Sequence, residues 1–252
     1  MINTKQVNKD EKGKKEIDMD LRVREVVKNY SDDNTPEYKE YRRRWKENPK
    51  KNVVGNFPIH VDLESTSHCN LRCPFCFQSF NPLPPHLLKF EWFKKVIDEG
   101  VQKGLCSIKL QYRGEPLLHP RLAEMVKYAK EKGVIEVMFN TNATLLNEKK
   151  SRALIKAGLD KIICSVDGYF KEVYEKNRVG AKWEAVLENI LRLQKIKKEL
   201  GSKKPIVRVQ MLETKENHPH VPGYIDFWKD KVESVVIEGV VDYYKEFVES
   251  KK

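Results

Sequence analysis

The sequence predicts an α/β protein built on a parallel sheet. Its 252 residues suffice for one such domain, and six short β-rich runs recur from Pro58 onward. Each run is followed by a segment with helical periodicity, and strands that alternate with helices at this spacing imply right-handed crossovers between parallel strands. Six repeats form either an open doubly wound sheet or a partial barrel, and periodicity does not choose between these two.

The predicted strands are rich in β-branched and aromatic residues and are bounded by turn residues. They cover residues 59–65, 106–112, 134–140, 160–166, 206–212 and 234–239.

The predicted helices show apolar residues spaced for one helical face. One of them lies between Pro120 and Gly133, residue types that punctuate helix ends. The apolar faces consist of Phe90, Phe93, Ile97 and Val101, of Leu122, Met125, Val126 and Ala129, and of Val186, Ile190, Leu193 and Leu200.

Residues 1–56 are highly charged, and we expect a mainly helical N-terminal extension with two short helices and a linker into a domain of residues 57–252. The first 20 residues have no apolar stretch after their basic residues, so they are not a secretory signal. No apolar run approaches the roughly 20 residues that a membrane helix needs. We therefore expect a cytoplasmic protein with no membrane contact.

The formal charge is +11, from 48 basic and 37 acidic residues. The densest basic run is EYKEYRRRWKENPKK at residues 37–51. This run indicates either a solvated helix face or a basic docking surface.

The stretch SHCNLRCPFCFQ at residues 67–78 places Cys69, Cys73 and Cys76 directly after the first predicted strand. The carboxyl ends of parallel strands carry active-site loops, and thiolates suit zinc or iron–sulfur clusters. Structural zinc needs a fourth ligand, and the other two cysteines, Cys106 and Cys164, lie in predicted strands as small buried hydrophobes. A cubane cluster held by three cysteines instead leaves one iron open. The odd, clustered cysteines therefore favour a metal site over disulfides.

Four motifs together resemble the radical S-adenosylmethionine (SAM) superfamily over residues 57 to about 245. The first is C-x3-C-x2-C with Phe75 before the last cysteine, which resembles the cluster motif. RGEPLLHP (113–120) is similar to the Gly-Gly-Glu-Pro motif, which holds the methionyl amino group, and NTNATLL (140–146) to a Thr-Asn-Gly-Thr-Leu stretch. SVDGYFKEVYEKNRVG (165–180) resembles a Ser-x-Asp-Gly…Arg-x-Gly pattern whose serine meets the ribose and whose arginine meets the SAM carboxylate.

The resemblance implies a partial (β/α)6 TIM-type barrel and two cofactors, a 4Fe-4S cluster and SAM. It implies that Cys69, Cys73 and Cys76 hold three irons while SAM chelates the fourth. The residues implied to bind SAM are Phe75, Gly114, Glu115, Asn140, Asn142, Ser165, Asp167 and Arg178.

The match is closest to the SPASM-type branch, which normally carries C-terminal auxiliary clusters. No cysteine follows Cys164, so this chain has no ligands for them. Two positions depart from the family pattern, Arg113 for the first glycine of Gly-Gly-Glu and Ala143 for the glycine of Thr-Asn-Gly. At position 143 an alanine must therefore adopt the local backbone shape that the family pattern gives to a glycine.

The implied activity is reductive cleavage of SAM to a 5′-deoxyadenosyl radical that abstracts hydrogen from a polar small molecule, sugar or peptide, in an oxidoreductase or transferase type of reaction. The excess of basic residues fits an acidic flavodoxin- or ferredoxin-like electron donor. The alternative is a non-catalytic metal-binding module, or a degenerate barrel that binds RNA or a protein partner.

Strand alternation predicts which side chains face the barrel interior, given that Ser165 must face the lumen if it contacts SAM. The residues assigned to the interior are then His60, Asp62, Glu64, Lys109, Gln111, Ile163, Asp167, Arg208, Gln210 and Glu238. Since a closed barrel core is mainly apolar, we expect a polar substrate held by Glu64, Lys109, Gln111, Arg208 and Gln210. The alternative is that these groups pair with one another or lie in solvent at an open seam.

Overall fold

The computed structural model describes residues 23–214 and 216–239. One seven-stranded sheet runs through them in the order β1-β7-β6-β5-β4-β3-β2. Its strands are β1 (Val23–Lys28), β2 (His60–Asp62), β3 (Ser107–Lys109), β4 (Glu136–Thr141), β5 (Lys161–Ser165), β6 (Ile206–Glu213) and β7 (Ser234–Gly239). All six predicted strands are present, and those predicted at residues 59–65 and 106–112 are shorter than expected.

Helices follow the strands along the chain. Those of the described residues are α1 (Pro36–Lys50), α2 (Phe77–Phe80), α3 (Phe90–Gln102), α4 (Leu122–Glu131), α5 (Glu148–Lys156), α6 (Lys171–Asn177), α7 (Trp183–Glu199) and α8 (Val221–Trp228), with short 3-10 turns η2 (Pro116–Leu118) and η3 (His218–His220). None of these helices is both long enough and apolar enough to span a bilayer.

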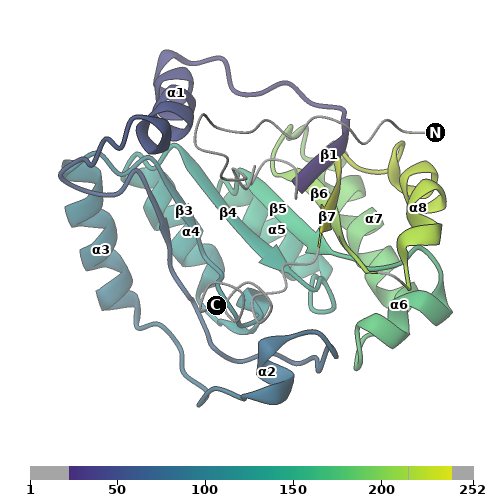
Figure 1. The fold of residues 1–252 in the computed structure, drawn as a ribbon. Coiled ribbons are helices and arrows are strands. Elements are labelled where there is room, and N and C mark those ends of the chain that lie inside the picture. The colour runs from purple at the N-terminus through teal and green to yellow at the C-terminus, as the bar shows by residue number, and fades with distance from the viewer. Residues whose placement is uncertain (1–22, 215, 240–252) are drawn as a thin grey trace, which may run out of the picture.

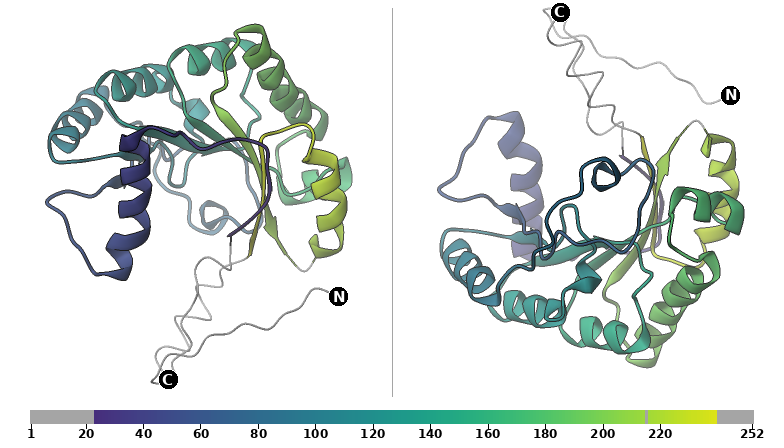
Figure 2. Two further views of the ribbon diagram at one scale, coloured as in Figure 1. Left: turned by 90° about the horizontal axis from the view of Figure 1, so that it is seen from above. Right: turned by 90° about the horizontal axis from the view of Figure 1, so that it is seen from below.

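The sheet curves into a partial barrel with the helices outside it. Strands β2 to β7 pair in parallel in chain order, and Figure 2 shows the helices following the convex face of the curved sheet. Alternate residues on the strands are fully buried on that face, among them Ile108, Phe139, Ile162, Val209 and Ile237. This arrangement confirms the partial barrel that the resemblance implies.

The predicted helix faces form the layer under the convex side. Phe93 and Ile97 of α3 are buried, as are the four predicted positions of α4 and the first three predicted positions of α7. Leu200 is the exception, because it follows the last residue of α7 and is 40% exposed. The assignment of Leu200 to this apolar helical face was therefore wrong.

The N-terminal segment differs from the expected pair of helices. Among its described residues, β1 pairs antiparallel with β7, and only α1 is helical. Five of the six residues of VREVVK are exposed, and only Val27 packs against the core, so backbone pairing mainly holds this edge strand in place. The rest of the segment, residues 1–22, and the end of the predicted barrel motif, residues 240–247, lie outside the described residues.

Helix α1 packs across the amino end of the barrel, where the parallel strands begin (Figure 1). Tyr41 is buried and donates a hydrogen bond to Glu136, the first residue of β4, over 3.1 Å. Trp45 meets His60, the first residue of β2, with 5.1 Å between ring centroids. The basic run therefore forms one packed aromatic face and one charged face, instead of a fully solvated helix.

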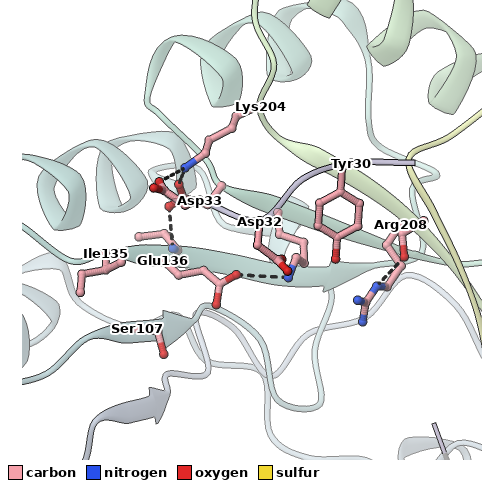
Figure 3. A network of polar contacts seen from close by, with 12 residues as sticks. Tyr30, Asp32, Asp33, Ser107, Ile135, Glu136, Lys204 and Arg208 are labelled. Atoms are coloured by element: carbon pink, nitrogen blue, oxygen red, sulfur yellow. Dashed lines mark hydrogen bonds and ion pairs between the residues drawn. The ribbon is translucent and has the colours of Figure 1, made fainter. Parts of the chain in front are cut away.

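A buried carboxylate, Asp160, ties three chain segments together beside that end. Its Oδ2 accepts from Lys130 Nζ at 2.7 Å and from the Val137 amide at 2.9 Å, while Oδ1 accepts from Lys204 Nζ at 2.5 Å. Lys204 also lies 3.7 Å from Asp33, which precedes α1 (Figure 3). The Asp160 side chain is only 6% exposed, so these two cations and one amide replace its hydration.

Replacing Asp160 with Ala should lower the free energy of unfolding by on the order of 3 kcal/mol, because two cations and one amide lose a buried partner. Urea denaturation followed by circular dichroism measures the change. The matched control is Asp226→Ala, which removes an exposed carboxylate paired with Lys229 and should change stability by no more than about 0.5 kcal/mol. Equal effects of the two substitutions would contradict the role of Asp160.

Candidate active site

The cysteine loop lies at the carboxyl end of the barrel, opposite to α1. It connects β2 to α2, and Figure 1 shows α2 at the far end of the sheet from α1. A cavity of about 270 Å³ opens there, lined by Cys69, Cys73 and Cys76 together with residues from the ends of β3, β4 and β5. Seven of the residues predicted by the motifs line it with the cysteines, namely Phe75, Gly114, Glu115, Asn140, Asn142, Ser165 and Arg178. Gln111, which strand alternation assigned to the interior, lines it as well.

The three cysteine thiols are free and largely withdrawn from solvent. Burial is the main reason that the pKa values of Cys69 and Cys73 lie above their ordinary range. An amide NH of Asn142 lies 4.0 Å from Cys69 Sγ, and Arg178 Nη1 lies 3.8 Å from Cys73 Sγ. These donors face the sulfurs and would stabilise them as thiolates. Cys106 and Cys164 are buried elsewhere, as predicted.

Gly114 lets the RGEP stretch approach the cysteine loop. A Cβ at this position would lie 1.8 Å from the carbonyl oxygen of Thr66, so only glycine fits. The next amide, that of Glu115, donates to the carbonyl of His68 over 2.7 Å. This close approach of two backbones places the end of β3 beside Cys69.

Glu115 is buried with its carboxylate oxygens already engaged. Oε1 accepts from Thr141 Oγ1 at 2.7 Å and from the Leu117 amide at 3.0 Å, and Oε2 accepts from the Asn142 amide at 2.7 Å. Burial raises the pKa of this carboxyl, and the hydrogen bonds oppose the shift. The side chain therefore braces the end of β3 against the end of β4.

The turn after β4 has the strained backbone that the alanine at position 143 leads us to expect. Ala143 adopts φ = 59°, in the left-handed region that favours glycine, and its side chain is fully buried. Asn189 of α7 donates to its carbonyl over 2.9 Å and helps to hold this shape. Asn142 is thereby aimed at the cysteine loop, where it also donates to Asn70 Oδ1 over 3.0 Å.

After β5, Asp167 and Arg178 form a buried ion pair. Arg178 Nε lies 2.5 Å from Asp167 Oδ2, and Asp167 Oδ1 accepts from the Leu212 amide at 2.8 Å. The Arg178 guanidinium also lies 5.3 Å from the ring centroid of Phe75. Asp167 itself does not line the cavity, so its role in this structure is to hold Arg178.

The five predicted substrate residues lie at different places. Gln111 lines the cysteine cavity, and Glu64 accepts from the Arg113 amide at its edge over 2.9 Å. Lys109 pairs with Asp62 over 3.2 Å, and Gln210 donates to Glu238. Arg208 lies toward the amino end, where it pairs with Glu25 of β1 at 3.2 Å. Two of the five, Lys109 and Gln210, therefore pair with other residues assigned to the interior, whereas the partner of Arg208 lies on β1, outside that set.

The residues present fit a 4Fe-4S cluster. Three free thiols with neighbouring NH donors line one cavity at the mouth of the barrel. Within the described ranges, no three His, Cys, Asp or Glu side chains converge as they would on a single metal ion. A cluster does not require such convergence, because each thiolate binds a different iron.

A family model of the radical SAM superfamily matches residues 63–207. The chain belongs to this superfamily. The match spans the cysteine loop, the Gly114–Glu115 stretch, the β4 turn and the Asp167–Arg178 pair, and it agrees with the prediction of a 4Fe-4S cluster and SAM as cofactors.

Curated relatives share about a third of their residues with this chain. A tungsten-containing aldehyde ferredoxin oxidoreductase cofactor-modifying protein of Pyrococcus furiosus is 32% identical over 168 residues, which are 65% of this chain and 46% of the relative. A GTP 3′,8-cyclase of Chlorobaculum tepidum is 29% identical over 179 residues, 70% of this chain and 52% of the relative. The chain thus spans about half the length of the curated relatives it matches.

Solved structures share the fold at lower identity. SuiB of Streptococcus suis bound to the precursor peptide SuiA has a TM-score of 0.60 at 19% identity, over 80% of this chain and 45% of SuiB. The structure of anSMEcpe with AdoMet and the Kp18Cys peptide has a TM-score of 0.56 at 20% identity, over 73% of this chain and 52% of that chain. Both likenesses support the radical SAM barrel.

Several residues at the site were not predicted from the sequence, among them Asn70, Gln78 and Tyr112. Asn70 connects the cysteine loop to the β4 turn through Asn142 and through Thr144 Oγ1 at 2.9 Å. Gln78 is buried and donates to the Arg113 carbonyl over 2.9 Å, while Tyr112 forms an exposed part of the rim. A polar residue inside a metal-binding loop is the one signal that would have pointed to Asn70.

Proposed function

We propose that this chain forms the catalytic barrel of a radical SAM enzyme acting on a polar substrate. The observation that carries the proposal is the gathering of Cys69, Cys73 and Cys76 in one cavity with the ends of three parallel strands. When bound, the cluster and SAM supply reductive cleavage of SAM and hydrogen abstraction by the 5′-deoxyadenosyl radical. The chain's own part is to bind, orient and shield these groups.

Each motif has a role in the proposal. The three thiolates hold iron, and Asn142 and Arg178 donate toward two of the sulfurs. We assign the backbone at Gly114 to the methionyl amino group, because the carboxylate of Glu115 is occupied by three donors from the protein. Arg178 keeps one edge on Asp167, which orients its remaining nitrogens toward the cavity.

The remaining cavity residues complete the proposed SAM site. Asn140 and Ser165 lie at the ends of neighbouring strands and offer polar side chains to the ribose. The exposed ring of Phe75 covers one side of the cavity and limits access of water.

Replacing Cys73 with Ala should abolish iron binding at this site and all SAM cleavage, because one of three thiolate ligands is lost. Iron content after anaerobic reconstitution and 5′-deoxyadenosine formed under reducing conditions measure the two effects. Cys106→Ala is the matched control, since Cys106 is buried away from the cavity. Wild-type rates of 5′-deoxyadenosine formation in the Cys73 variant, or a colourless zinc-containing wild-type protein, would refute the proposal.

The substrate is proposed to enter beside Gln111. Relatives named GTP 3′,8-cyclase and structures with bound peptide both involve polar substrates with many hydrogen-bonding groups. Gln111 offers an amide at the cavity wall, with Lys109 two residues before it at the end of β3 and Glu64 just after the neighbouring strand β2. We also assign Gln210, deeper in the lumen, to the substrate-binding residues. Arg208 is not assigned to them, because it lies toward the amino end of the barrel.

Replacing Gln111 with Leu should leave iron content and uncoupled SAM cleavage nearly intact while substrate turnover falls by about tenfold or more, as expected when a polar substrate group loses its partner. Gln102→Leu, an exposed position on α3, controls for the loss of an amide. The measurement compares 5′-deoxyadenosine with product across candidate peptides, sugars and nucleotides. Unchanged turnover in the Gln111 variant would exclude the residue from the substrate site.

The electron donor is proposed to dock at the carboxyl end of the barrel, close to the cysteines. Arg113 lies at the rim with its guanidinium 4.8 Å from the ring centroid of Phe77 and 5.2 Å from that of Tyr112. No carboxylate among the described residues pairs with this guanidinium. The cation and exposed aromatic rings suit an acidic flavodoxin- or ferredoxin-like protein, whereas the basic run of α1 lies at the opposite end (Figure 1).

Replacing Arg113 with Gln should slow reduction of the reconstituted protein by reduced flavodoxin, and the wild-type rate should fall as added salt screens the attraction. Stopped-flow absorbance at several salt concentrations measures both effects. Lys50→Gln removes the same charge from an exposed position on α1 and should leave the rate within about twofold, since screened charges far from the contact steer weakly. A salt-independent rate, or equal slowing by both substitutions, would reject this docking site.

A further inference from the structure

A second cavity lies at the amino end of the barrel, opposite to the cysteines. Its volume is about 620 Å³, within the range of roughly 300–1,000 Å³ that is typical of small-molecule sites. It lies between α1, the segment from β1 to α1, and the first halves of β5 and β6. The residues that line it are Glu25, Lys28, Tyr30, Asp32, Asp33, Asn34, Tyr38, Lys39, Arg42, Arg43, Lys46, Lys161 and Arg208.

Every acidic side chain of this lining already has a cation. Glu25 pairs with Arg208 at 3.2 Å, Asp32 with Lys28 at 2.6 Å, and Asp33 with Lys204 at 3.7 Å. Figure 3 shows Asp32, Asp33 and Arg208 around this end of the sheet.

Two of the remaining cations have carboxylates outside the lining. Lys161 pairs with Glu136 over 3.1 Å, and Arg43 pairs with Glu40 and Glu47 of its own helix at 2.7 and 2.8 Å. Lys39, Arg42 and Lys46 are left without a carboxylate partner among the described residues. The cavity therefore carries an uncompensated positive charge.

The three unpaired cations share one side of α1. Their spacing of three and four residues puts them side by side on the helix, where like charges repel and cost about 0.2–0.5 kcal/mol per pair. Arg42 is held in place by the rings of Tyr41 and Trp45, 5.5 and 5.6 Å from its guanidinium carbon. An arginine already oriented in this way loses little freedom when it binds an anion.

We propose that this cavity binds an oligophosphate group, as carried by a nucleoside triphosphate or by inorganic polyphosphate. Several phosphates in a row match a stripe of three cations better than a single carboxylate or phosphate does, and guanidinium and ammonium groups both bind phosphate oxygens. Because the cavity and the cysteines lie at opposite ends of the sheet, this site is separate from the proposed catalytic one. The proposal does not depend on the radical chemistry.

Isothermal titration of the full chain with inorganic tripolyphosphate tests the proposal, and titrations with GTP and ATP distinguish the two sources of the phosphates. We expect saturable one-to-one binding that weakens as salt is added. The triple variant Lys39→Gln, Arg42→Gln, Lys46→Gln should bind tripolyphosphate at least about tenfold more weakly, because it loses the charge-assisted hydrogen bonds to the phosphates. The double variant Lys39→Gln, Lys46→Gln keeps Arg42 and its aromatic contacts, and should show an intermediate loss.

The matched control removes three positive charges outside the cavity and outside α1, Lys127→Gln, Lys149→Gln and Lys198→Gln, all at exposed positions. It should bind tripolyphosphate within about twofold of the wild type, because distant exposed charges are screened. Tighter binding of GTP or ATP than of tripolyphosphate identifies a nucleotide as the source, and equal binding identifies the phosphates alone. Absence of saturable binding to the wild type, or equal losses in the two triple variants, overturns the proposal.

Discussion

The carboxylate of Glu115 is the contact on which the carboxyl end of the barrel depends. It joins η2, the end of β4 and the Asn142 amide through three hydrogen bonds, in a place that water does not reach. Removing it would leave buried donors unpaired, which costs more than the bonds themselves contribute. Gly114 then brings this braced unit against the cysteine loop. The geometry of the candidate active site thus depends on the buried carboxylate of Glu115 and on the absence of a side chain at Gly114.

In the rest of the barrel, the two faces of the sheet carry different kinds of side chain. Apolar residues fill the convex face under the helices, and the concave face carries paired polar groups such as Lys109 with Asp62 and Gln210 with Glu238. Such pairs contribute little net stability, so the helical layer supplies most of the burial. A concave face of this kind offers hydrogen-bonding groups to a polar ligand, which an apolar barrel interior would not.

Much of this arrangement could be predicted from the sequence, and the limits have physical causes. Strand alternation gives the face on which a side chain lies but not its height along the barrel, so Arg208 was grouped with Gln111 although the two lie toward opposite ends. Motif spacing places Glu115 and Asp167 at the site, yet only the contacts reveal that each holds a neighbour. Strand β1 was missed because backbone pairing, which leaves no pattern of side chains, holds it to β7.

That antiparallel pairing also bears on the behaviour of the protein at high concentration. A parallel barrel that does not close has two edges, and an exposed edge is a template for pairing with a second molecule. β1 covers β7, and it carries Arg24, Glu25 and Lys28, whose charges oppose the pairing of a further strand. At the other edge β2 is only three residues long. By pairing with β7, β1 therefore removes the edge that the last parallel strand would otherwise offer to a second molecule.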